Sequence, residues 1–228
     1  MITFIDLHPV TRLVADAVAP RWAGVLDRCE FVGGAGVHAM LQWHDAWRDI
    51  ASDAGLSTLD AARLFAMLST ASSDGLIGCW DSKYNYAFWR PVTAIRVGGG
   101  NPNLEADPDW IGFVITPNHP EYPAAHGCFS GAVVATLQAY FGTDEFSFRM
   151  TSPAPGLIRP VRQYDSFSQA LEDALLARIY GGCITGTQLS TARSSASRSR
   201  GRWSRTFSYL QVHGRQIASR PHSERREV

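Results

Sequence analysis

The sequence lacks any uninterrupted apolar run of the length that a membrane-spanning helix needs, about 18 residues. Its opening residues, MITFIDLHPV, have neither the basic start nor the apolar stretch of a signal peptide. The four cysteines lie far apart without a CxxC pair, which argues against zinc-ribbon and thioredoxin-like sites. We therefore expect a soluble, cytoplasmic protein whose thiols stay reduced.

Lysine is almost absent, because the 228 residues include 20 arginines and a single lysine, Lys83. Net charge is zero, so no overall field attracts nucleic acid or an anionic membrane, and we expect neither partner. The balance hides an asymmetry. Residues 1–182 carry 12 basic and 19 acidic side chains, whereas residues 183–228 carry nine arginines and two glutamates. This change of composition predicts a boundary after residue 182.

Clear strand patterns of period two are also absent, whereas apolar residues recur at helical spacing in several segments. We expect helices over about 37–51, 57–80, 81–89, 127–141 and 166–179, the last opened by the capping box Ser166-x-x-Gln169. Residues 98–124 are rich in glycine and proline and predict a long irregular connection of the kind that often carries function. The fold class predicted for residues 1–182 is a single all-α helical bundle.

Residues 183–228 contain nine serines and nine arginines among 46 residues, with little apolar surface to bury. This composition predicts a disordered tail. A basic tail that binds nucleic acid is the alternative, although few aromatic residues and no RNA- or DNA-binding motif accompany the charges.

The first candidate for chemistry is the pair Lys83 and Arg90, seven residues apart. On one continuous helix this spacing would place both cations on one face, about two turns apart. A lysine and an arginine that converge in this way suit a tetrahedral oxyanion, since one supplies a point charge and the other a planar fork of donors. An ordinary solvated helix face can show the same spacing.

Two further segments add candidates. His126 lies directly before a predicted helix, where unpaired N–H groups favour an anion and the imidazole could act as a general acid or base. A simple capping histidine would look the same. Arg178 ends a helix with an apolar face, which by itself indicates only a favourable charge at a helix C-terminus.

In this order the three segments resemble the signature of the superfamily that joins vanadium-dependent haloperoxidases to type 2 phosphatidic acid phosphatases, which reads K-x6-RP, PSGH and SR-x5-H-x3-D. The first motif is complete from Lys83 to Arg90 and its following proline. The second stands as PAAH, ending in His126, and the third begins at Arg178. Ile184 occupies the position where the family has its histidine.

The resemblance implies the helical fold of that superfamily, with Lys83, Arg90 and Arg178 holding phosphate or vanadate and His126 as acid–base group. A haloperoxidase would bind vanadate as its cofactor and oxidise halide with hydrogen peroxide, which Lys83 would polarise. A soluble acid phosphatase would use the same pocket without a cofactor. Isoleucine can neither ligate vanadium nor attack phosphorus, so we expect impaired activity, or a non-catalytic remnant that only binds oxyanions.

A shift of the reading frame would account for the broken third motif. The residues CITGT at 183–187 have codons that, read one base earlier, can spell Met-His-Tyr-Arg-Asn and place a histidine at position 184. We infer that a one-base deletion near codon 182 replaced the native C-terminal helix and left the domain incomplete. The apolar face uncovered by the lost helix would favour a homodimer.

Overall fold

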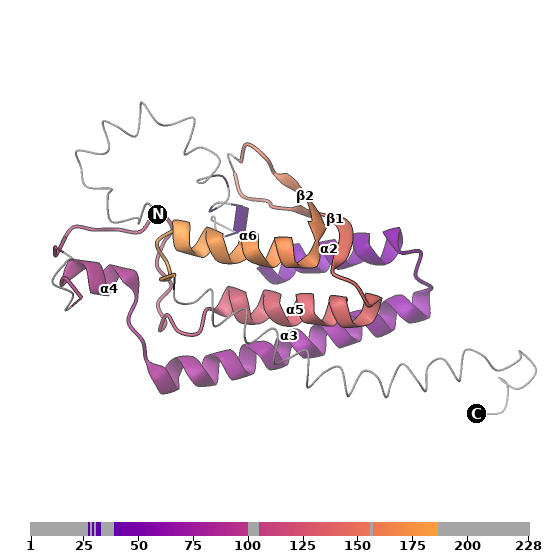
Figure 1. Cartoon of the computed structure of the whole chain (residues 1–228), viewed down its shortest axis with the longest axis horizontal. Helices are drawn as coiled ribbons and strands as arrows, with labels where there is room; N and C mark the ends of the chain where they lie inside the picture. Colours follow the sequence, from indigo (N-terminus) through magenta and orange to yellow (C-terminus); the bar gives the residue numbers. More distant parts are fainter. Residues whose placement is uncertain are drawn as a thin grey trace, which may run out of the picture.

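The structure is a computed structural model that describes residues 27, 29, 31, 32, 39–99, 105–155 and 157–186. The predicted disordered tail therefore falls outside the described residues, apart from its first four positions. The elements in chain order are helices α2 (Ala39–Asp53), α3 (Thr58–Tyr86), α4 (Pro91–Arg96) and α5 (Ala125–Phe141), strands β1 (Glu145–Thr151) and β2 (Val161–Ser166), and helix α6 (Phe167–Tyr180). The predicted helical bundle is confirmed (Figure 1).

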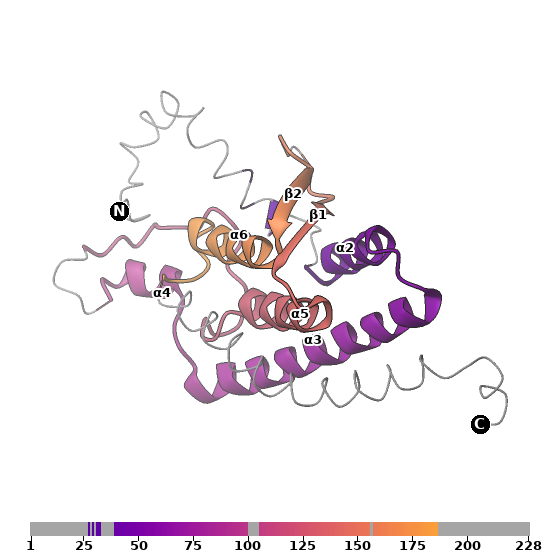
Figure 2. The ribbon, with the colours of Figure 1, turned by 45° about the vertical axis from the view of Figure 1, so that its right-hand side comes forward.

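Helix α5 lies between α3 on one side and α6 on the other, as both ribbon views show (Figures 1 and 2). Ten of its 17 residues are buried, among them Val133 and Leu137. A helix that is apolar around its whole circumference belongs in the interior of a bundle. Gly75 of α3 permits a close approach, because a Cβ there would lie only 3.1 Å from the Cβ of Ala132.

Helix α3 is a single helix of 29 residues, so the predicted division into 57–80 and 81–89 is wrong. Its start is as expected, since the Ser57 side chain accepts a hydrogen bond from the amide of Asp60. Its end comes at Tyr86, where Ala87 adopts the left-handed conformation with φ 45° and its amide donates to the carbonyl of Lys83. The chain reverses there, and Pro91 then opens α4.

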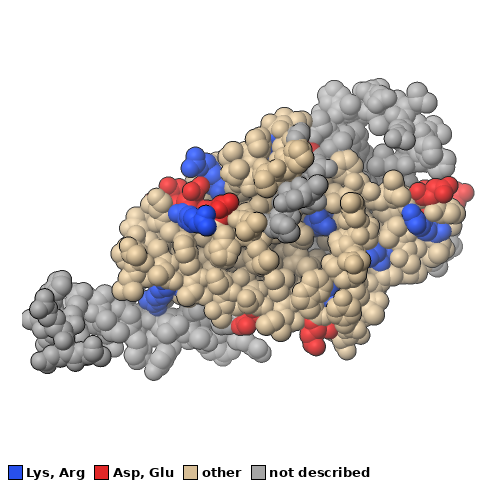
Figure 3. Space-filling view, turned by 180° about the vertical axis from the view of Figure 1, so that it is seen from behind, with Lys and Arg blue, Asp and Glu red and all other residues tan. Residues whose placement is uncertain are grey.

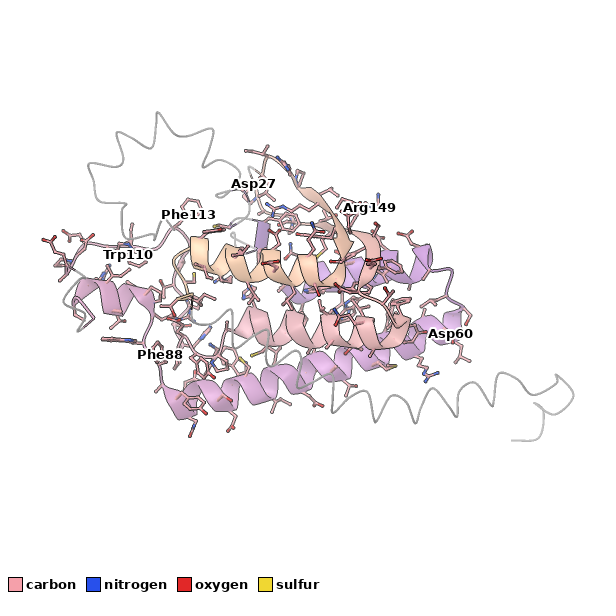
Figure 4. The ribbon with its side chains drawn as sticks, viewed as in Figure 1. Asp27, Asp60, Phe88, Trp110, Phe113 and Arg149 are labelled. Atoms are coloured by element: carbon pink, nitrogen blue, oxygen red, sulfur yellow. The ribbon has the colours of Figure 1, made fainter. Side chains whose placement is uncertain are left out.

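The sequence patterns did not anticipate the antiparallel hairpin of β1 and β2, in which Phe148 pairs with Tyr164 and both side chains are buried. The hairpin leads directly into α6, whose first turn is capped by Ser166 as predicted. Arg162 of β2 forms ion pairs of 3.0 Å with Asp27 and 2.6 Å with Asp173. These pairs connect the hairpin to α6 and to the segment before α2, on the side where Figure 4 labels Asp27.

Within the described part of the chain, no helix combines the length and the apolar character needed to cross a bilayer. On the face shown in Figure 3, charged side chains are scattered among uncharged residues rather than gathered into one basic or acidic patch.

Candidate oxyanion site

The candidate site residues lie at one end of the bundle, where the C-terminal ends of α3 and α6 meet the N-terminal end of α5 (Figures 1 and 4). Phe88, Trp110 and Phe113 mark this end in Figure 4, whereas Asp60 and Arg149 lie at the opposite end. Side chains far apart in the sequence can therefore meet here.

Lys83, in the last turn of α3, is fully buried, with 0% of its surface exposed. Its Nζ donates hydrogen bonds to the backbone carbonyls of Pro120 (2.7 Å) and Glu121 (2.9 Å). Burial lowers the pKa of Lys83 to about 8, and the negative charge of Cys79 opposes that shift. The ammonium is thus mostly charged at neutral pH.

Arg90 is buried beside Lys83, and its guanidinium donates hydrogen bonds to two segments of the backbone. Its Nε donates to the carbonyl of His119 (2.9 Å) and its Nη1 to the carbonyl of Cys183 (2.7 Å). Burial lowers the pKa of Arg90. The prediction that Lys83 and Arg90 share the face of one helix is wrong, because the helix ends between them and the reversal at Ala87 brings both to the loop around residue 120.

Arg178 lies in the last turn of α6 and is 6% exposed. Its guanidinium makes no side-chain hydrogen bond to the described residues, and its charge acts on Arg90, lowering the pKa of that group. A negatively charged ligand would stabilise two buried cations that lie close together.

His126, the second residue of α5, is half-buried and lines a cavity together with Phe31, Val32 and Ser130. Burial and the charge of Arg178 lower its pKa to about 3, although a hydrogen bond to the backbone of Val32 opposes the shift. Because Cys128, two residues further along α5, lies toward α3, His126 points to the other side of the helix. The structure thus places His126 near Arg178, and the charges of His119 and Arg90 also lower its pKa.

Ile184 is 6% exposed and packs with Ala124 and Cys183 in a small apolar cluster that also includes Val114 and Ile179. This packing occupies the position at which the resemblance places a histidine. Along the described chain, no group of three or more His, Cys, Asp or Glu side chains could hold a metal ion.

Glu121 is a site residue that the motif analysis missed. Its side chain is fully buried, and Oε1 accepts hydrogen bonds from the amide (2.8 Å) and hydroxyl (2.7 Å) of Thr185. Its other oxygen, Oε2, is buried without a hydrogen-bond partner in the described structure. The sequence contained one indication of Glu121, its place in the Gly/Pro-rich connection five residues before His126. The burial of its carboxylate could not be predicted, because a loop has no periodic pattern that shows which side chains face inward.

The buried charges at this end of the bundle do not balance. Lys83, Arg90 and Arg178 contribute three cations, and among the described residues here Glu121 is the buried carboxylate that opposes them. This excess fits a tetrahedral oxyanion held by charge and hydrogen bonds. It does not match the third motif of the resemblance, because position 184 offers no nitrogen, and the imidazole beside the cations is that of His119, 3.0 Å from Nη2 of Arg90.

Comparisons with known proteins identify the family and the fold. A family model described as the VCPO second helical-bundle domain matches residues 63–202, so the match runs past residue 182. Vanadium chloroperoxidase from Curvularia inaequalis is 32% identical over 96 residues, which cover 38% of this chain and 15% of that protein. The chain thus spans only a small part of the curated relative that it matches.

Two solved structures share the fold. A bacterial vanadium-dependent iodoperoxidase superposes with a TM-score of 0.67 and 26% identity, over 82% of this chain and 45% of that one. A bacterial vanadium-dependent chloroperoxidase superposes with a TM-score of 0.52 and 20% identity, over 64% of this chain and 36% of that one. In both cases the chain covers less than half of the solved protein.

Proposed function

The chain belongs to the family of the VCPO second helical-bundle domain, and from this membership we propose that its site binds a tetrahedral oxyanion such as phosphate or vanadate. We further propose that the sequence as it stands oxidises halide at or near the background rate. The first part rests on the buried cations, and the second rests on Ile184.

The observation that carries the binding proposal is the set of three buried cations, Lys83, Arg90 and Arg178, at one end of the bundle. In a protein interior, a cation is stable only when an opposite charge or hydrogen-bond acceptors compensate it. The backbone carbonyls that Lys83 and Arg90 contact supply acceptors for those two groups. An oxyanion would add the negative charge that opposes all three cations.

Each residue has a distinct part in such a complex. Lys83 would contribute a point charge from α3 and Arg90 a fork of donors already fixed by the carbonyls of His119 and Cys183. His126, with a pKa of about 3, is neutral at neutral pH and is too weak a base to take a proton from the bound anion, so we assign it no proton transfer. Glu121 adds negative charge that weakens the attraction of the three cations for the oxyanion.

The proposal of impaired turnover follows from the apolar side chain at position 184. In the superfamily that this chain resembles, the histidine at that position ligates vanadium in haloperoxidases and attacks phosphorus in phosphatases. Ile184 is packed against Ala124 and Cys183, and the imidazole that does lie beside the cations belongs to His119, whose Nδ1 is 3.0 Å from Nη2 of Arg90. We therefore derive no peroxide or halide step for this chain, and the acid phosphatase alternative loses its nucleophile for the same reason.

Isothermal titration with phosphate and with orthovanadate tests the binding proposal. Arg178→Gln removes one of the three buried cations and should weaken binding of both anions by about tenfold or more. Arg149→Gln, an exposed arginine at the opposite end of the bundle, is the matched control and should bind as the parent does. Equal affinity in the two variants would overturn the proposed site, provided that both show the parent's circular dichroism.

Turnover is tested separately with bromide, hydrogen peroxide and vanadate, and with p-nitrophenyl phosphate. We expect neither reaction above background in the parent chain. Halide oxidation that depends on vanadate, or phosphatase activity lost in Arg178→Gln, would show that the role assigned to position 184 is wrong and would identify which chemistry the site performs.

We also propose that residues 1–182 form the domain and that residues 183–228 are a tail read in a shifted frame. The coding sequence decides this, because a one-base correction must restore a histidine at position 184 followed by helical periodicity. Ile111 (75% exposed) and Ile115 (90% exposed) support the proposed homodimer by leaving apolar surface at this end of the bundle. Light scattering behind a sizing column gives the mass, and a monomer at all concentrations would contradict the dimer.

A further inference from the structure

Exposed aromatic side chains gather at the end of the bundle that carries the buried cations, where Figure 4 labels Phe88 and Phe113. In the part of the chain that the structure describes, the most exposed aromatic residues are Trp80, Tyr84, Tyr86, Phe88, Trp89 and Phe113. All but the last come from the final turns of α3 and the reversal that follows it. Apolar surface that is exposed and concentrated in one place commonly marks a binding site.

Trp80 connects this exposed surface to the cations. Its side chain is 38% exposed, and the centroid of its ring lies 5.6 Å from Nζ of Lys83. The ring also meets the imidazole of His119 edge to face, with 4.7 Å between the centroids. Nδ1 of His119 lies in turn 3.0 Å from Nη2 of Arg90. The indole is therefore close to the cation-binding end of the site while part of it stays open to solvent.

Neighbouring rings lie along the same loop as the cations. Tyr84 is 67% exposed and comes one turn after Trp80 on the same side of α3. Tyr86 meets Tyr122 edge to face, with 5.2 Å between the ring centroids. Tyr122 directly follows the two carbonyls that accept the hydrogen bonds of Lys83. One loop thus supports both the buried charge and the exposed aromatic surface.

The burial of the cations determines what a larger ligand would contact. Lys83 is 0% exposed and Arg90 is 8% exposed, so an oxyanion bound to them lies below the surface of the protein. An organic group attached to that oxyanion must extend toward solvent. Trp80 is the exposed ring that borders Lys83, and a flat aromatic group beside it can stack, whereas a methyl group covers little of its surface.

We propose that Trp80, with Tyr84 beside it, forms a subsite for the aromatic group of an aryl ester of a tetrahedral oxyanion, such as an aryl phosphate or an aryl sulfate. This inference rests on the proposed oxyanion site, because the buried cations attract the anionic group of the ester. Contact with the exposed rings then selects among esters by their organic part.

Calorimetric titration of the full-length protein with inorganic sulfate, methyl sulfate and phenyl sulfate tests the two proposals separately. The two esters carry the same single negative charge and differ only in their organic group. We expect phenyl sulfate to bind about tenfold more tightly than methyl sulfate. If sulfate and methyl sulfate bind and phenyl sulfate binds no better, the subsite is wrong and the oxyanion site stands. If no anion binds, or phenyl sulfate alone binds, both proposals fail.

Variants assign the preference to particular side chains. Trp80→Ala should reduce the preference for phenyl sulfate to about twofold or less and should still bind methyl sulfate. Tyr84→Ala should also reduce the preference, and it keeps the subsite testable if Trp80→Ala does not fold. Leu59→Ala, at a position with 79% exposure near the start of the same helix, is the matched control and should keep the full preference.

Two results with these variants would overturn the subsite. One is a preference for phenyl sulfate that stays unchanged in Trp80→Ala and Tyr84→Ala, because the aromatic group would then bind elsewhere. The other is a parent dimer that shows no preference for phenyl sulfate and dissociates in Trp80→Ala, because a second copy of the chain would then cover the exposed rings.

Discussion

Binding of an oxyanion at this site should weaken as the pH rises through the pKa of Lys83. The lysine is fully buried, and burial lowers its pKa to about 8, within the range over which the protein can be studied. Loss of the proton removes one of the three buried cations and leaves the repulsion from Glu121 less opposed. The affinity for the anion therefore falls as the pH rises, because the anion prefers the protonated lysine.

The size of the effect follows from the fraction of lysine that carries a proton. With a pKa of about 8, Lys83 is roughly nine-tenths charged at pH 7 and roughly one-tenth charged at pH 9. If the anion binds only the charged form, the apparent Kd is the intrinsic Kd divided by that fraction, so affinity should fall about tenfold over these two pH units. His126 stays neutral throughout, since its pKa is about 3.

Calorimetric titration with sulfate is the best assay, because sulfate is tetrahedral and keeps the same charge over this pH range. In Lys83→Met, binding should be weaker at neutral pH and should lose most of its pH dependence. Cys79→Ala controls for the thiol next to Lys83, whose pKa is also shifted, and should keep the decline. The reasoning is refuted if the parent binds sulfate equally at both pH values, or if Lys83→Met declines as steeply as the parent.

Three further outcomes are expected. Replacing the buried carboxylate in Glu121→Gln should tighten sulfate binding several-fold by calorimetry, because a negative charge beside the cations is lost; weaker binding would mean that Glu121 instead organises the site. His126 has a folded-state pKa of about 3 against 6.5 for an exposed histidine, so unfolding in urea should become easier as the pH falls from about 6.5 toward 3, by up to roughly 4 kcal/mol. His126→Gln should flatten this dependence, and an unchanged slope would assign it to other groups. Leu137→Ala, at a position with 0% exposure in α5, should lower the free energy of unfolding by about 3 to 5 kcal/mol, whereas Leu59→Ala, 79% exposed, should change it little.

Local signals predicted local structure well. Ser57 and Ser166 cap their helices as expected, because an N-cap depends on one side chain and an amide three residues away. The hairpin was missed although Phe146, Phe148 and Met150 alternate with polar residues in β1, a signal of period two that the helical patterns around it obscured.

Lys83 and Arg90 do lie close together, as predicted from the sequence, but not for the reason that was expected. The spacing suggested one helix face, but α3 ends at Tyr86 and the two cations meet because the chain reverses at Ala87. A turn that relies on a non-glycine residue at positive φ is not encoded by a recognisable local signal, so sequence reasoning could not locate it.

By itself, the sequence determined the helical class, the capped starts of α3 and α6, the inventory of cations and the absence of an imidazole at position 184, because each depends on residue identity or on neighbours within a few positions. Only the tertiary structure decided that Glu121 is buried among those cations and that His126 faces Val32 and Arg178. Both depend on how α5 docks between α3 and α6, and that docking is set by side-chain packing across many positions rather than by any single motif.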